Sequence, residues 1–186
     1  MIDIKKPGYC EEPYIWKEDK RLFNRMAKFI GCYHSNVVAD IGVSNIKIKV
    51  LEDKLNIVAD HIIEDDFNNG IKSNCKYHTV FCFEVLEHLQ NPMLFLKSIR
   101  DNLMFNTSNL YLSLPGRPKF LWTEHHFREY TPKALKKWLL DPLDLYIVRK
   151  KKLMIGGQPW WFYITGIRPI FRLFLNHTVI YEIKKK

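Results

Sequence analysis

Residues 80–103 read VFCFEVLEHLQNPMLFLKSIRDNL, and they decide the fold that the sequence predicts. The stretch begins inside the apolar run 79–83, which is typical of a strand covered on both faces of a sheet. After a short polar turn, Asn91 is a favourable N-cap and Pro92 suits the first position of a helix. The apolar stripe of that helix consists of Leu96, Ile99 and Leu103. The stretch therefore predicts a buried strand followed by a helix that packs on the sheet.

The same alternation of strands and helices continues on both sides of this stretch. Apolar residues at helical spacing predict helices over 16–30 and 46–54, and Thr131 with Pro132 marks the start of another. Further strands are predicted over 37–41, 56–60, 109–114, 144–154 and 177–184. This order predicts an α/β sheet with helices on both faces. In such sheets the ligand lies beyond the carboxyl ends of the strands.

Composition and length favour one globular domain over residues 1–186. The chain has 47% hydrophobic and 26% charged residues, which is typical of a folded protein. We find no N-terminal apolar run of a secretory signal and no apolar stretch long enough for a transmembrane segment. The four cysteines are scattered and form no CxxC pair, which argues against a zinc site or a disulfide framework. These features predict a cytoplasmic location.

The net charge of +9 is concentrated in the last two-fifths of the chain. Residues 115–186 hold 15 lysines and arginines against 5 acidic residues, whereas residues 1–114 hold 14 against 15. Such a basic region is either a solvated surface or a face for an acidic partner: nucleic acid, a phosphorylated sugar or an anionic lipid. The stretch 156–175, GGQPWWFYITGIRPIFRLFL, adds aromatic residues to two arginines. It predicts a helix packed on the sheet or a peripheral membrane contact through 158–175, and its aromatics also suit base stacking.

Four segments with recognisable motifs follow one another along the chain: VVADIG (37–42), FEVLEH (83–88), NLYLSLP (109–115) and HHFREYTPKALKKWL (125–139). Together they resemble class I S-adenosylmethionine-dependent methyltransferases of the EVLEH type, similar to methyltransferase types 11 and 23. The resemblance covers roughly residues 20–150. It implies a doubly wound, mostly parallel, Rossmann-like sheet with an antiparallel last strand.

The resemblance also implies how the chain is organised. Residues 1–32 would form an N-terminal helical cap, and residues 156–176 an aromatic and basic insertion between the last two strands. Asp40 and Glu84 are only 44 positions apart, which is short for the usual two strand–helix units. The region 43–78 is therefore expected to lack a helix or an edge strand.

The cofactor implied by the resemblance is S-adenosylmethionine. Asp40 would orient the first loop and the ammonium group of the cofactor, and Gly42 would let the backbone approach it. Ser44 and Asn45 stand where the family usually has glycines, so the loop is expected to be a reduced one.

Two further carboxylates complete the expected cofactor site. Asp60 follows an apolar run, as the ribose-binding acid of the family does, and Asp65 or Asp66 is its competitor because the shortened connection blurs the register. Glu84 ends the central strand and would border the cofactor.

The expected catalytic residues are histidines. His88, His125 and His126 are candidates for a general base, because an imidazole with a pKa near ~6.5 can accept the proton of a hydroxyl group. Glu84, Glu87, His88 and His126 also match the metal-binding pattern of small-RNA 3′-terminal 2′-O-methyltransferases. Metal-free methyltransferases of small molecules carry nearly the same residues, and we expect no metal here.

The resulting hypothesis is methyl transfer from S-adenosylmethionine to a hydroxyl or amine of a small-molecule or glycan-like acceptor, with an anionic acceptor favoured over nucleic acid. One alternative is a methyltransferase-like binding module that has lost catalysis, as the glycine-poor loop indicates. A second alternative is metal-assisted RNA 2′-O-methylation.

Overall fold

The computed structural model describes residues 13–31, 37–42, 46–63, 66–73, 75–116, 128, 130–154 and 177–186. Its centre is a six-stranded sheet with the strand order β2-β1-β3-β4-β6-β5. β1, β2, β3 and β4 are mutually parallel, and β6 runs antiparallel to both of its neighbours. The strands are β1 (Val38–Ile41), β2 (Ala59–Ile62), β3 (Tyr77–Phe83), β4 (Met104–Pro115), β5 (Leu145–Met154) and β6 (His177–Lys185).

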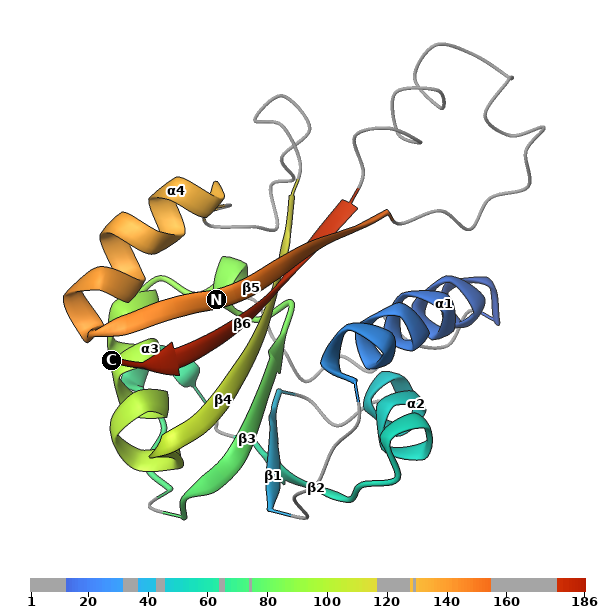
Figure 1. Ribbon diagram of the computed structural model, residues 1–186, viewed down its shortest axis with the longest axis horizontal. Helices are drawn as coiled ribbons and strands as arrows, with labels where there is room; N and C mark the ends of the chain where they lie inside the picture. The colour runs from blue at the N-terminus through green and yellow to red at the C-terminus, as the bar shows by residue number, and fades with distance from the viewer. Residues whose placement is uncertain are drawn as a thin grey trace, which may run out of the picture.

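Helices cover both faces of this sheet (Figure 1). One face carries α1 (Pro13–Ile30) and α2 (Ile46–Leu55). The other carries α3 (Pro92–Ser98), which continues through the π-helical turn η4 (Ile99–Leu103), and α4 (Pro132–Leu135), which continues through η6 (Lys136–Leu140) and η7 (Asp141–Leu143). Two short 3-10 turns are η2 (Phe67–Asn69) and η3 (Leu86–His88). The predicted doubly wound α/β sheet with an antiparallel finish is confirmed.

The helix after β3 begins as the sequence predicts. The Asn91 side chain accepts a hydrogen bond from the backbone N–H of Leu94 at 3.3 Å, and Pro92 occupies the first turn. Thr131 does the same for α4, because its hydroxyl accepts from the N–H of Ala134 at 3.2 Å. These caps satisfy N–H groups that lack a partner within the helix.

The shortened region between β1 and β3 is also confirmed. Between the end of β2 and the start of β3, the described residues contain only the turn η2. In the strand order, β2 is the edge strand on this side of the sheet. The predicted strand 56–60 was placed too early, because Asn56 adopts a left-handed conformation with φ 53° at the end of α2. This turn delays the strand to Ala59–Ile62.

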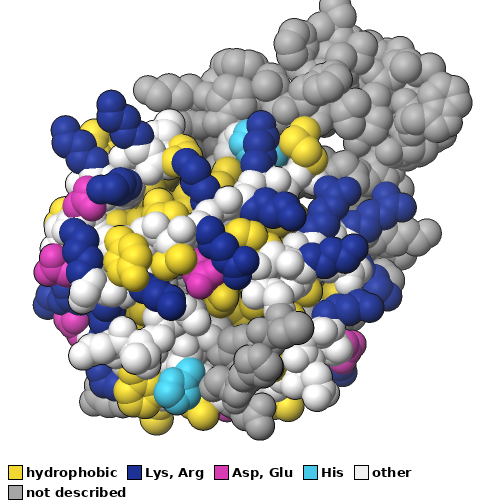
Figure 2. Space-filling model, viewed as in Figure 1, with side chains coloured by type: hydrophobic (Ala, Val, Ile, Leu, Met, Phe, Trp, Pro, Cys, Tyr) yellow, Lys and Arg dark blue, Asp and Glu magenta, His cyan; other side chains and the backbone are white. Residues whose placement is uncertain are grey.

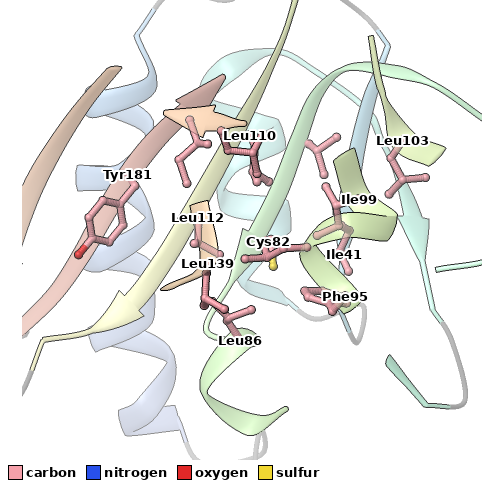
Figure 3. Packing of buried hydrophobic residues seen from close by; sticks show 14 of the residues in the cluster. Ile41, Cys82, Leu86, Phe95, Ile99, Leu103, Leu110, Leu112, Leu139 and Tyr181 are labelled. Carbon is pink, nitrogen blue, oxygen red and sulfur yellow. The ribbon is translucent and has the colours of Figure 1, made fainter. Parts of the chain in front are cut away.

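Two apolar clusters hold the layers together, one on each face of the sheet. Figure 3 shows the cluster on the α3 and α4 side, where Phe95 and Ile99 lie near Cys82 of β3, and Leu112 of β4 lies near Leu139. The strand β3 is buried at five of its seven positions, as expected for a strand covered on both faces. In the described part of the chain, no helix is both long and apolar enough to cross a membrane.

Arg149 ties α1 to the antiparallel edge of the sheet. Its guanidinium lies 4.4 Å from the ring centroid of Phe29 and donates to the carbonyl of Ile30 at 3.3 Å. Its Nε donates to the carboxylate of Glu182, a residue that is only 8% exposed. One side chain therefore connects the end of α1 to both β5 and β6.

Replacing Arg149 with Ala is expected to lower the free energy of unfolding by about 2 kcal/mol. The variant leaves the Glu182 carboxylate buried without its cation, and the half-exposed position of Arg149 keeps the loss below that of a fully buried pair. Urea unfolding measures the change. The matched control is Lys150→Ala, which removes the same charge from an exposed neighbouring position and should change stability by less than about 0.5 kcal/mol. Equal losses in the two variants would contradict this account.

Candidate functional site

The carboxyl ends of three parallel strands meet at one edge of the sheet. Ile41 pairs with Cys82, so the residues after β1 and β3 lie side by side. Phe83 pairs with Ser113 near the end of β4. The chain changes direction between β1 and β3 in the sheet order, and this is where open α/β sheets bind ligands.

Gly42 closes β1 in a conformation that other residues rarely adopt. Its φ is +140°, and its N–H donates to the carbonyl of Ile62 at 3.3 Å. A Cβ atom at this position would lie 3.6 Å from the Cγ2 of Val85, in the turn after β3. The contact alone would be tolerated, so the backbone conformation is what favours glycine.

Asp40 lies beneath this turn as a buried carboxylate. It is 6% exposed, and its Oδ2 lies 3.4 Å from Nδ1 of His61, its register partner on β2. Burial raises the pKa of Asp40 to about 6, although His61 lowers it, and the charge of Glu52 raises it further. The end of β1 therefore holds a carboxyl group that titrates near neutral pH.

Glu84 follows β3 in the left-handed region, with φ 54°. Its N–H donates to the Ser113 carbonyl and hydroxyl, both at 3.2 Å, and the Ser113 hydroxyl donates to the Glu84 Oε1 at 2.9 Å. A non-glycine residue in this region is strained by roughly 1–3 kcal/mol, and such residues gather at functional sites. Ser113 thus holds both the backbone and the carboxylate of Glu84 in place.

The turn η3 separates a buried acid from an exposed histidine. Glu87 is fully buried, and its carbonyl accepts from the N–H of Arg128 at 3.3 Å. Its carboxylate lies close to the Cys82 thiol, whose pKa is raised by burial, then by Glu87, then by Asp40. His88 is exposed on the same turn. Within the described ranges, no three His, Cys, Asp or Glu side chains are placed to hold a metal ion.

Two of the three acids considered for the ribose are described, Asp60 within β2 and Asp66 beyond its end. Asp60 is the second residue of the strand and pairs with Ala39. Burial, and then Asp60, raise the pKa of Tyr77 at the opposite end of β3. Asp66 lies beyond the carboxyl end of β2, where its carboxylate caps η2 by accepting from Asn68 N–H at 2.9 Å.

Hydrogen bonds connect η2 to the start of α3. The Asn68 side-chain oxygen accepts from the N–H groups of Gln90 and Asn91, at 2.7 and 3.0 Å. Asp66, Asn68 and the loop after η3 therefore form one hydrogen-bonded unit.

Several predicted site residues lie outside the described residues. They are Ser44, Asn45, Asp65, His125 and His126, together with the stretch 158–175. The structure thus brings together Asp40, Gly42 and Glu84 and leaves the proposed histidine pair undescribed. Sequence reasoning missed His61 and Ser113, whose only signals were a histidine and a serine inside two short strands.

Comparison with known proteins addresses the fold. No protein-family model matches the sequence, and no curated protein sequence matches it. Among solved structures, a protein described as a methyltransferase, in complex with the Haloferax volcanii Trm112 methyltransferase activator, superposes with a TM-score of 0.67 at 12% identity. That superposition covers 93% of this chain and 94% of the other. The chain has the class I methyltransferase fold.

Two further structures show how widely this fold is used. The glycopeptide N-methyltransferase MtfA superposes with a TM-score of 0.57 at 11% identity, over 90% of each chain. The cyclase SpnF superposes with a TM-score of 0.52 at 10% identity, over 89% of this chain and 81% of that one. At these identities the class I methyltransferase fold is established, and the reaction has to be argued from the site.

Proposed function

We propose that the protein is an S-adenosylmethionine-dependent methyltransferase that acts on a hydroxyl or amine of a small-molecule or glycan-like acceptor. The observation that carries the proposal is the pair Gly42 and Glu84. Both have positive φ, and they lie next to each other at the carboxyl ends of β1 and β3. A strained residue such as Glu84, at the point where strand order reverses, is expected of a ligand site.

The residues present fit the cofactor. Gly42 offers backbone without a side chain, and the fixed carboxylate of Glu84 can accept hydrogen bonds from a ribose or an amine. Asp40 is paired with His61 two residues before Gly42, and its carboxylate can place negative charge near a cationic ligand. When bound, S-adenosylmethionine supplies an electrophilic methyl group on a sulfonium.

Of the two described acids considered for the ribose hydroxyls, Asp60 and Asp66, we favour Asp66. It lies beyond the end of β2, on the side where β1 and β3 also end, whereas Asp60 lies within the strand. Its oxygens are held by the Asn68 and Asn69 amides, which fix the direction of the carboxylate. Two acceptor oxygens suit two vicinal hydroxyl groups.

The acceptor is proposed to lie over η3. His88 is exposed on this turn and can accept a proton as the methyl group arrives. His125 and His126 keep the same proposed role. Because methyl transfer is an in-line displacement, holding the acceptor in line supplies most of the rate, and the rigid Glu87 turn beneath His88 serves that positioning.

Ligand binding tests the proposal in a thermal-shift scan. S-adenosylhomocysteine at 100 times its Kd is expected to raise Tm by about 5–10 °C, because a ligand at that ratio stabilises by about 2.7 kcal/mol. Adenosine, which lacks the amino-acid part that would meet Asp40, should give a smaller shift. The absence of any shift at millimolar ligand would contradict cofactor binding.

A second function is favoured by one sequence feature. Gly42 is followed by Val43, Ser44 and Asn45 where the family usually has glycines, so the chain can be a binding module without catalysis. A methyltransferase-like module of this kind would leave Tm unchanged with S-adenosylhomocysteine. A Tm increase would rule out a module that has lost the cofactor.

A further inference from the structure

A basic groove lies between α1 and the end of β5. Its volume is about 410 Å³. Figure 2 shows lysine and arginine side chains gathered on the side of the molecule where these two elements lie. Among the described residues, the groove is lined by Arg25, Lys28, Lys151, Lys152, Leu153 and Met154, none of which is acidic.

Three of the lining cations, Arg25, Lys28 and Lys151, have no acidic partner among the residues that the structure describes. Every ion pair of that part of the chain involves other side chains. Arg25 donates one hydrogen bond to the Met154 carbonyl at 2.5 Å, which fixes its guanidinium at the wall. Arg149, which is on β5 like Lys151, differs in being paired with Glu182. Cations without an acidic partner among the described residues create a positive potential around this hollow, and that potential attracts an anion.

The position of the groove connects it to the site at the sheet edge. Phe83 pairs with Ser113, Ser113 with Ile180, and Ile180 with Lys151. These residues form one row across the sheet, and paired residues point to the same face. Lys151 therefore lies on the face that Ser113 shares with α1. Three strand spacings of ~4.8 Å separate it from the end of β3, a distance of about 14 Å.

We propose that this basic groove binds a phosphate or diphosphate group of the methyl acceptor, with Lys151 about 14 Å from the end of β3. The inference rests on the proposed function and narrows its substrate class to an elongated acceptor with a phosphorylated end. Lysine provides point charges for phosphate oxygens, and the Arg25 guanidinium adds directed N–H donors. The groove has the size of a small-ligand site rather than of an extended polymer track.

Titration calorimetry with inorganic pyrophosphate tests the groove in the absence of any methyl donor. Binding is expected at low salt and should weaken as salt is added, because exposed charges are screened. Lys151→Gln and Lys28→Gln are each expected to weaken pyrophosphate binding by about fivefold. Lys150→Gln is the matched control: it removes the same charge from the adjacent residue, which pairs with Tyr181 on the opposite face. This control should bind like the unchanged protein.

The outcomes separate the groove from its alternatives. Equal weakening by Lys150→Gln and Lys151→Gln, or no pyrophosphate binding at all, would overturn the proposal. Vesicles with anionic lipid and a single-stranded oligonucleotide are tested in parallel. If vesicles or the oligonucleotide bind more tightly than pyrophosphate, and Lys151→Gln does not weaken that binding, the proposal of a phosphorylated acceptor is wrong. The pyrophosphate experiment contains no methyl donor, so its result does not depend on S-adenosylhomocysteine binding. If pyrophosphate binds and S-adenosylhomocysteine does not, the groove is an anion site and the proposed methyltransferase function is wrong.

Discussion

Glu84→Gly is expected to weaken S-adenosylhomocysteine binding by about 10–100-fold, because hydrogen bonds to a charged group contribute about 1.5–3 kcal/mol. The folded state should tolerate the change. Glu84 has φ 54°, a region that glycine adopts without strain, and this relief offsets the lost hydrogen bond from Ser113. We expect the free energy of unfolding to stay within about 1 kcal/mol of the unchanged protein. Calorimetry measures the affinity, and urea unfolding measures the stability.

The chain offers a matched control for this variant. Asn56 has nearly the same φ, 53°, but it lies between α2 and β2, away from the ends of β1 and β3. Asn56→Gly should leave stability similarly unchanged and should bind S-adenosylhomocysteine normally. If Glu84→Gly binds as tightly as Asn56→Gly, the strained residue at the end of β3 has no part in the cofactor site.

Asp40→Asn is expected to change how stability depends on pH. The folded pKa of Asp40 is about 6, raised mainly by burial from 3.8. Between pH 3.8 and pH 6, the Asp40 carboxyl is mostly protonated in the folded protein and mostly ionised in the unfolded chain. The folded state therefore binds more protons, and the free energy of unfolding falls as pH rises through this range. The difference between the two pKa values corresponds to about 3 kcal/mol. Relative to the unchanged protein, Asp40→Asn should therefore gain about 3 kcal/mol between pH 4 and pH 8.

Urea unfolding at pH 4, 6 and 8 measures this difference. Glu52→Gln provides a second variant, because the Glu52 charge contributes to the raised pKa of Asp40 while its oxygen accepts from the Ala59 N–H at 2.9 Å. Glutamine keeps an acceptor and removes the charge, so it should reduce the pH dependence without removing it. Parallel stability profiles for Asp40→Asn and the unchanged protein would show that folding does not raise the pKa of Asp40.

Much of the fold follows from local chemistry in the sequence. The apolar run of β3, the Asn91-Pro92 start of α3 and the Thr131-Pro132 start of α4 are decided by neighbouring residues, and all three were predicted. The antiparallel finish followed from the family resemblance and from two alternating strands at the end of the chain. The position of β2 was missed by three residues at its start, because the left-handed turn at Asn56 is not visible in apolar periodicity.

The site was only partly accessible from the sequence. Asp40, Gly42 and Glu84 could be named because the family resemblance assigns roles to residues at the ends of these two apolar strands. Their partners His61 and Ser113 come from other strands, and such contacts depend on which strands become neighbours and in which register. The basic groove was missed for the same reason. Its cations belong to α1 and β5, segments more than 120 positions apart, although the charge of the C-terminal region was evident.

A crystal structure grown with S-adenosylhomocysteine tests the central claim most directly. We expect the ligand to lie over the carboxyl ends of β1 and β3, against the Gly42 backbone and within hydrogen-bonding distance of the Glu84 carboxylate. A ligand bound anywhere else on the protein, or crystals without ligand at a concentration far above that used for the thermal shift, would contradict the claim that this edge of the sheet is a methyl-donor site.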